Sequence, residues 1–362
     1  MKTLFFSTKK ITSALAFTLM LIAVTAYSYG GERDLNVSYR TPEDINAFLQ
    51  SHPVAHDAFS ESYEFSYSDA PRLSSSYEPG SLSKSDLNSA LHMLENIRYI
   101  AGLPADLKLS NDYNRMAQAL HMLENIRYIA GLPADLKLSN DYTRMAQAAS
   151  LVNYSNDSIS HYPEFPSNIS SKTAKSGMKA CAESNLAWDS WQNTSLEHSI
   201  LNVWMKDDSV SNIKALGHRR WILSPEMKRT GFGAVSGSRG TYNTMYVFDF
   251  GRKVKTNYQV AWPAQQMPVS YFPEGTPWSL SLGKVLNSEK IKVTLTRLSD
   301  NKVWNFSKKQ ADGAFYVNND GYGQKGCIIF NPKNIGHCKS GDKFIVKVSG
   351  VGKEISYSVN FF

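Results

Sequence analysis

The stretch that decides the fold runs from Leu216 to Gly233 and reads LGHRRWILSPEMKRTGFG. It places His218 between a glycine and two arginines, ahead of an apolar turn, a proline break and a glycine-rich return. A histidine in this setting is expected to face a cleft. Further histidines and carboxylates lie upstream, in Ile159-Ser-His161-Tyr-Pro, Glu183-Ser-Asn185-Leu-Ala and Trp204-Met-Lys-Asp207-Asp208. They follow no regular spacing, so only a fold can bring them together.

In that order and with those flanks, the segments resemble the CAP superfamily of cysteine-rich secretory proteins, insect antigen 5 and plant pathogenesis-related protein one. The resemblance covers residues 86–251 and is closest to bacterial secreted members. It implies an α-β-α sandwich whose cleft is lined by two histidines and two acidic residues. His161 matches the first histidine and His218 the second. Asp207 follows Trp204 by three residues, where the family usually has Glu.

The fourth cleft position departs from the family pattern. The family's Glu directly precedes an Asn, whereas here Ser184 precedes Asn185 and Glu183 is displaced by one residue. Two neutral imidazoles and a carboxylate suit a divalent ion such as zinc, so the resemblance makes His161, His218 and Asp207 candidate metal ligands. The alternative is that the two histidines hold the cleft walls together by hydrogen bonds.

Other residues near the cleft segments have competing interpretations. Ser184 and Cys181 are the candidate nucleophiles, but neither lies in the strand-to-helix turn of a nucleophile elbow. Arg219 and Arg220 would either bind an anion or pair with nearby carboxylates such as Asp207 and Asp208. The sequence Gly-Phe-Gly at 231–233 is interpreted as a backbone turn, since no phosphate-loop lysine follows it.

The first 26 residues have the pattern of a signal peptide. Lys2, Lys9 and Lys10 precede an apolar run that ends in the small-residue sequence Val24-Thr-Ala26. The pattern predicts a secreted, extracellular protein. Removing the three lysines lowers the formal charge from +7 to +4, and no Lys/Arg stripe typical of nucleic-acid binding is present in the sequence.

The chain has 362 residues, a length that favours two domains over one. Residues 27–85 are rich in serine, tyrosine and acidic residues and are expected to form a flexible lead segment. One helix is predicted within it at residues 42–50, with Thr41 as N-cap and Pro42 at the first position. His52 and His56 flank Pro53 and are expected to be solvated loop residues.

A tandem repeat follows the lead segment. Two 29-residue copies, at 90–118 and 119–147, differ only at Asn114 and Thr143. Each copy predicts a helix with an apolar stripe, a turn and the start of a second helix. One copy is expected to be surplus, because the implied fold has one groove for that stripe. We expect a continuous helix over 111–130 at the junction, and self-association through the extra copy.

Residues 258–362 change to strand-like runs separated by Gly, Asn and Asp clusters, which predicts an immunoglobulin-like β-sandwich. The boundary, at 252–259, predicts a C-terminal piece that folds on its own. Cys327 and Cys338 are spaced to close one disulfide loop, which leaves Cys181 as a free thiol.

The predicted class is therefore α+β, with a CAP-like domain at 86–251 ahead of the β-sandwich. The resemblance implies a secreted protein that binds a lipid, a cell-wall component or a protein partner through its cleft, and it carries no general catalytic activity. One alternative is a metal-assisted hydrolase in which Glu183 is the general base. Another is a structural surface protein without a ligand.

Overall fold

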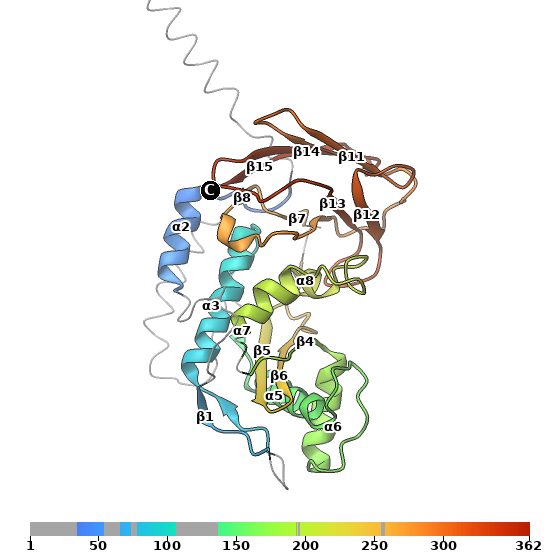
Figure 1. Ribbon diagram of the computed structural model, residues 1–362. Coiled ribbons are helices and arrows are strands. Elements are labelled where there is room, and N and C mark those ends of the chain that lie inside the picture. The colour runs from blue at the N-terminus through green and yellow to red at the C-terminus, as the bar shows by residue number, and fades with distance from the viewer. Residues whose placement is uncertain are drawn as a thin grey trace, which may run out of the picture.

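The computed structural model describes residues 35–53, 66–73, 78–105, 137–192, 194, 196–254 and 258–362 (Figure 1). The predicted signal peptide, His56, and the helix expected over 111–130 lie outside these residues. None of the described helices is long and apolar enough to cross a membrane.

The first region is built on a four-stranded sheet in the order β3-β5-β6-β4. Its strands are β3 (Lys137–Leu138), β4 (Ser184–Asp189), β5 (Arg229–Gly237) and β6 (Gly240–Tyr246). β3 pairs with β5 in parallel, and the other pairs are antiparallel. Both faces of the sheet are buried, because Phe232 and Met245 enter one hydrophobic cluster while Val235 and Tyr242 enter another.

Helices cover both faces of this sheet. α5 (Asn140–Ser155) and α6 (Ser171–Ala182) pack on one face. The other face packs against four helices: α3 (Lys84–Ile100), α7 (Leu196–His198), the π-helix η1 (Ser199–Met205) and α8 (Gly217–Ile222). This is the α-β-α arrangement that the family resemblance implied, and it confirms the α+β class.

Two glycines of β5 set the distance between the strand and α5. A Cβ atom on Gly231 would lie 2.2 Å from the backbone nitrogen of Thr143, and one on Gly233 would lie 2.3 Å from the carbonyl carbon of Ala146. The prediction of a turn at 231–233 is therefore wrong. The glycines are part of a strand, and their lack of a side chain lets the helix backbone approach it closely.

The lead segment packs more tightly than its composition predicts. α2 (Pro42–Ser51) confirms the predicted helix, and Thr41 and Asp44 form a reciprocal capping box at its start. Ile45 and Phe48 are buried in the same cluster as α3. His52 is also buried and stacks on Phe48 with ring centroids 3.8 Å apart, so the expectation that it is solvated is wrong.

The remaining described elements of the lead are a short hairpin, β1 (Tyr67–Asp69) and β2 (Ser81–Leu82), which precedes α3. The hairpin is tied to α3 through Asp86. The backbone N–H of Ser66 donates to Asp86 Oδ2 at 2.7 Å, and Asp86 is itself buried.

The C-terminal region forms two sheets, in the orders β11-β10-β14-β15-β8 and β12-β13-β9-β7. The elements are β7 (Val260–Trp262), β8 (Gln266–Met267), η2 (Val269–Tyr271), β9 (Trp278–Ser281), β10 (Lys292–Arg297), β11 (Val303–Ser307), β12 (Gly313–Asn318), β13 (Cys327–Pro332), β14 (Lys343–Ser349) and β15 (Ile355–Phe361). Aromatic rings join the sheets: Trp278 of β9 lies 5.3 Å from Phe344 of β14 between centroids. The strand-rich region is thus compatible with the predicted β-sandwich.

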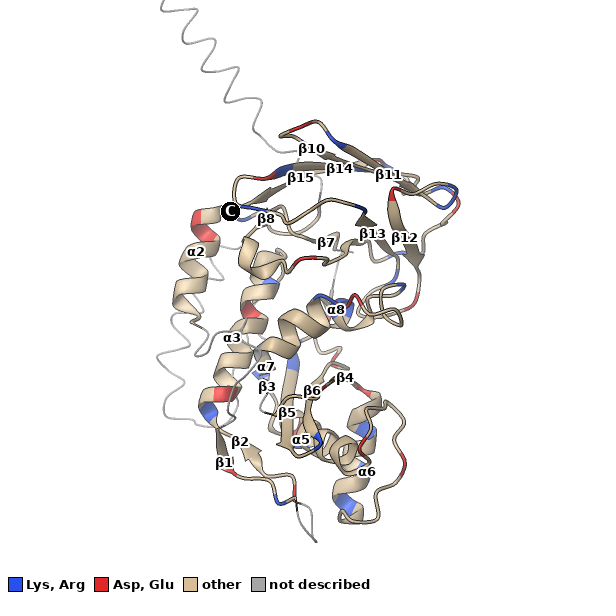
Figure 2. Ribbon diagram, in the orientation of Figure 1, with Lys and Arg blue, Asp and Glu red and all other residues tan. Residues whose placement is uncertain are grey.

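Helix α8 connects the two regions through Arg219, whose side chain is fully buried. Its guanidinium donates to backbone carbonyls on both sides, Met205 at 2.6 Å in the first region and Pro277 at 2.7 Å in the second. Arg220 likewise reaches the carbonyl of Gln324 at 2.9 Å. One hydrophobic cluster also runs through both regions. In the view of Figure 2, positive and negative residues are interspersed over both regions.

The three cysteines are free thiols. Cys327 is fully buried beside Leu216 and Ile329, whereas the partly exposed Cys338 packs against the main cluster. The disulfide suggested by their spacing is therefore not formed in this structure.

Candidate functional site

His218 lies in the first turn of α8 and is held by a buried carboxylate. Its Nδ1 is 2.9 Å from Oδ1 of Asp207, whose side chain is fully buried, while the side chain of His218 stays 17% exposed. Asp207 Oδ2 accepts from the backbone N–H of Arg219 at 3.3 Å. Because an ionised carboxylate only accepts hydrogen bonds, Nδ1 carries the proton. In the neutral ring, Nε2 is then left with a free lone pair.

The backbone that carries this pair has unusual geometry. Asp207 and Leu216 both have left-handed φ angles, 53° and 49°, although neither is glycine. Asp207 follows the π-helix η1, and Trp204 of that helix donates from Nε1 to the carbonyl of Leu186 at 3.0 Å. π-helices and left-handed non-glycine residues are concentrated at functional sites, where surrounding contacts keep the strained backbone in place.

His161 lies in the exposed loop between α5 and α6. Its Nδ1 is 2.7 Å from the carbonyl oxygen of Cys181, at the end of α6. A carbonyl can only accept, so this nitrogen also carries the proton and Nε2 of His161 also keeps its lone pair. The loop is held in turn by the N–H of Ser160, which donates to Asn153 Oδ1 at 3.1 Å.

Both histidines are fixed against one short stretch of chain, residues 181–185, which joins α6 to β4. His161 binds the carbonyl of Cys181, and the side chain of Asn185 donates to the backbone carbonyl of His218 at 3.0 Å. Glu183 and Ser184 lie between these two contacts in the sequence. The fold thus gathers the predicted cleft segments around 181–185.

Glu183 belongs to a cluster that the sequence did not reveal. Tyr246 donates from its hydroxyl to Glu183 Oε2 at 2.8 Å, and its ring stacks on Tyr142 at 4.1 Å. Tyr142 in turn donates to Asp249 at 3.1 Å, and Arg229 pairs with the same carboxylate. Burial, and next the hydrogen bond to Glu183, raise the pKa of Tyr246. Tyr142, Arg229 and Tyr246 come from α5, β5 and β6, while Glu183 lies between α6 and β4 and Asp249 follows β6, so no sequence spacing marks the cluster.

The two candidate nucleophiles have the environment of core residues. Cys181 is fully buried, and burial raises the pKa of its thiol to about 12. Such a thiol is a poor nucleophile, because the reactive form is the thiolate. Ser184 is 4% exposed, and its hydroxyl has no hydrogen-bond partner within the part of the chain that the structure describes. Neither side chain is hydrogen-bonded to His161 or His218 in that part.

The two arginines after His218 do not face a ligand site. Arg219 and Arg220 are buried and are used by the contacts between the two regions. Asp208 pairs with Lys206 at 3.0 Å, which leaves Asp207 as the carboxylate beside His218.

A zinc site with three protein ligands does not fit this arrangement. Asp207 is fully buried, and both of its oxygens already have partners, so it orients His218 as a supporting group would. Within the described ranges, no group of three or more His, Cys, Asp or Glu side chains is placed to hold a metal ion. The Nε2 atoms of His161 and His218 remain the candidate ligand atoms.

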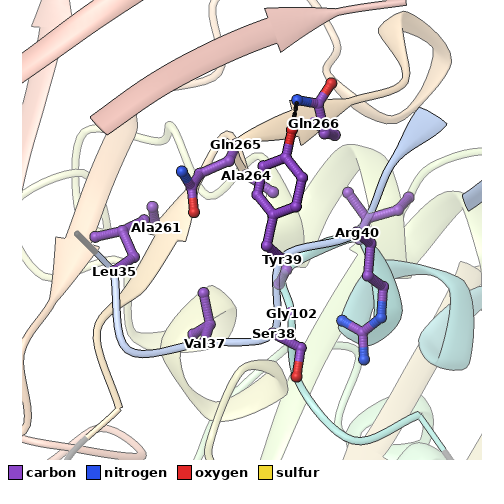
Figure 3. Close-up of a pocket in the computed structure, with 12 residues that line it drawn as sticks. Leu35, Val37, Ser38, Tyr39, Arg40, Gly102, Ala261, Ala264, Gln265 and Gln266 are labelled. Carbon is purple, nitrogen blue, oxygen red and sulfur yellow. Dashed lines mark hydrogen bonds between the residues drawn. The ribbon is translucent and has the colours of Figure 1, made fainter. Parts of the chain in front are cut away.

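A separate pocket lies away from the histidines, between the lead segment, the end of α3 and the start of the C-terminal region (Figure 3). Tyr39 and Gln266 meet at its wall, where Gln266 Nε2 donates to the tyrosine hydroxyl at 2.7 Å. Gly102 forms part of the lining, and a Cβ atom there would lie 2.6 Å from the carbonyl oxygen of Ser38. The pocket is thus a gap where these three segments pack against one another.

Comparison with protein families gives a match over residues 120–250 to the CAP model, described as the cysteine-rich secretory protein family. The chain therefore contains a CAP-family region over these residues. No curated protein matches the chain. The matched residues include all five predicted site residues of the CAP domain: His161, Glu183, Ser184, Asp207 and His218. The match begins in the second copy of the repeat, at Leu120.

Proposed function

We propose that the CAP domain binds an extracellular ligand or partner protein at His161 and His218. CAP domains are generally ligand-binding or partner-binding modules, which sets the class of function. The observation that supports this site is the pair of fixed histidines. Each ring uses Nδ1 in a hydrogen bond to an acceptor of the protein and keeps Nε2 as an acceptor for something else.

Neutral imidazole acceptors suit a ligand that donates hydrogen bonds, such as the hydroxyl groups of a cell-wall glycan or of a lipid headgroup. The next residue after His161, Tyr162, is 87% exposed, and its ring adds an apolar surface beside that histidine. A partner protein with exposed serine, threonine or lysine side chains supplies similar donors. The signal-peptide pattern predicts secretion, which would bring the domain into contact with cell-wall glycans, lipids and partner proteins.

Binding to purified cell-wall fragments, to lipid vesicles and to secreted proteins tests the proposal. We expect His161→Ala and His218→Ala each to weaken binding about tenfold or more, equivalent to about 1.4 kcal/mol. His337→Ala is the matched control, because His337 is exposed and lies in the C-terminal region. If both site variants bind every tested ligand as the wild type does, the proposal fails and the histidines have only a structural role.

The second candidate is a metal-assisted hydrolase, and the Asp207–His218 pair is the observation that favours it. A carboxylate that orients a histidine through Nδ1 is the usual support of a metal-binding imidazole. A zinc ion there would be held by the Nε2 atoms of His161 and His218 alone, because Asp207 is already used to orient His218, and when bound it would supply an activated water. Calorimetric titration of Zn²⁺ into the wild type and into the His161→Ala/His218→Ala double variant tests this candidate. Equal binding, or none, in both proteins rejects it.

A further inference from the structure

In the described structure, the elements that one repeat copy encodes are drawn from both copies. α3 and the turn after it, through Ala105, come from the first copy, whereas β3 and the first half of α5, from Lys137, come from the second. Residues 106–136 separate these ends. A single uninterrupted copy has only two residues at the same place, Asp106-Leu107 or Asp135-Leu136. The intervening stretch is therefore longer by one 29-residue block.

Both ends approach the same stretch of chain, residues 222–228. Arg98 of α3 donates from Nε to the carbonyl of Pro104 at 2.9 Å and from Nη1 to the carbonyl of Ser224 at 3.1 Å. The backbone N–H of Lys137 donates to the carbonyl of Lys228 at 2.7 Å. Arg98 thus contacts both Pro104 and Ser224, and Lys137 contacts Lys228, four residues further along the same stretch.

α3 fills a groove that is specific for its sequence. Leu94 and Ile97 are fully buried in the main cluster. Asn96 donates to the hydroxyl of Tyr271 at 3.0 Å and to the carbonyl of His52 at 3.2 Å, and Arg98 donates to the carbonyl of Ile222 at 2.8 Å. Every one of these four side chains has an identical counterpart 29 residues later: Leu123, Asn125, Ile126 and Arg127.

We propose that this groove accepts either copy of the repeated helix, so that the chain exchanges between two arrangements. The first, seen in the structure, places Ala90–Ala105 in the groove. The second places Ala119–Ala134 there, continuous with β3 and α5, and leaves the surplus block ahead of Ala119. The CAP match, which begins at Leu120, corresponds to the second arrangement.

The sequence ahead of the helix sets the balance between the two arrangements. In the first, Ser83 caps α3 and Asp86 accepts from Ser66, with both contacts partly buried. In the second, the equivalent positions are Asp112 and Arg115. Asp112 is also a good N-cap, but an arginine has no acceptor for the N–H of Ser66. Both arrangements carry one surplus block, so their chain-closure entropies are similar. The first arrangement is favoured, and the second releases the β1–β2 hairpin.

Paired substitutions in the full chain test this proposal. Leu94→Ala weakens only the first arrangement and Leu123→Ala only the second, because each leucine fills the groove in one of them. We expect Leu123→Ala to keep the wild-type melting temperature. Leu94→Ala should shift the population toward the second arrangement and lose little stability. The double variant should then lose clearly more than the two single variants together.

Hydrogen exchange gives an independent readout. In Leu94→Ala, peptides over residues 66–73 and 78–89 should lose protection, while the protection of α5 and β5 stays at the wild-type level. A double variant that is no less stable than Leu94→Ala alone would overturn the proposal, because the second copy would then contribute nothing. Leu94→Ala with full protection of the hairpin would overturn it as well. Sedimentation of each variant at two concentrations should match that of the wild type, and association that increases only in Leu94→Ala would show exchange between molecules and contradict exchange within one chain.

Discussion

His52 shows how burial changes the chemistry of one side chain. It is 6% exposed between α2 and α3, with Nδ1 3.0 Å from the carbonyl of Phe48 and Nε2 3.7 Å from Glu95. Desolvation, the largest cause, lowers the pKa of the imidazole from 6.5 to about 4, with a smaller contribution from His92. The ring is therefore neutral in the folded protein at neutral pH.

This lowered pKa predicts a loss of stability in acid. The unfolded chain binds the proton near pH 6.5, and the folded chain binds it only near pH 4. The unfolded state is therefore favoured as the pH falls through that window, by up to about 3 kcal/mol. Urea unfolding at a series of pH values measures the effect. His52→Phe keeps a ring on Phe48 but cannot titrate, so its stability should depend less on pH between 6.5 and 4. Parallel pH profiles for both proteins would contradict the assignment.

At the same scale, the sequence could select side chains that the fold places near one another, but not the part that each one plays there. The flanks of His161 and His218 and the spacing from Trp204 to Asp207 were enough to select residues that the fold gathers around 181–185. The role of Asp207 depends on its complete burial, which no local pattern encodes. The stacked pair Tyr142 and Tyr246 was missed for a similar reason, since stacking depends on how α5 crosses the sheet.

At the scale of elements, the contact between α5 and β5 depends on the absence of side chains on the strand. Gly233→Ala would place a Cβ atom 2.3 Å from the backbone of Ala146 and Gln147, and a helix backbone cannot yield as a side chain can. We expect a loss of about 2 kcal/mol or more in the free energy of unfolding. Denaturant unfolding followed by circular dichroism measures it.

Gly321→Ala is the matched control, because nothing lies within 4 Å of a Cβ atom at that position. It should change stability by no more than about 0.5 kcal/mol. Equal effects of the two substitutions would show that α5 can move away from the strand without cost. The sequence suggested a turn at 231–233 because glycine permits turns and close approaches alike, and only the packing partner distinguishes them.

At the scale of the whole molecule, α8 makes the two regions depend on each other. Arg219 donates to Met205 and Lys206 on one side and to Pro277 and Ser279 on the other. Burial lowers the pKa of its guanidinium only to about 10, so it remains charged at neutral pH. The change in sequence pattern predicted a domain boundary at residues 252–259, yet such a change does not reveal the buried contacts across it.

We therefore predict that the two regions unfold together. Arg219→Ala leaves several buried acceptors unsatisfied and should cost about 3 kcal/mol or more. Hydrogen exchange in increasing denaturant should show peptides of β5 and of β14 losing protection at the same concentration in the wild type. Arg144→Ala, which removes an exposed pair with Asp141, should cost less than about 1 kcal/mol. A stable C-terminal fragment after limited proteolysis would instead support the sequence-based expectation of independent folding.

The repeat gives a prediction about the complete chain. Removing residues 106–134 joins Ala105 to Asp135 and restores one uninterrupted copy between α3 and α5. All the contacts of α3 described above are kept, and the surplus apolar side chains are removed. We expect the shortened protein to be at least as stable as the full chain in thermal unfolding, because the described contacts of α3 and α5 are kept and the loop to be closed is shorter.

The same deletion tests self-association through the surplus copy, since its leucines and isoleucines would favour contact between molecules if they were exposed. Sedimentation velocity over a range of concentrations should show less association for the shortened protein than for the full chain. Its histidine site should also be unchanged, because His161, Asp207 and His218 lie outside the deleted block. A shortened protein that fails to fold would show that both copies are part of the core. It would also remove the basis for exchange between them, while leaving the ligand proposal to be judged by the histidine variants of the full chain.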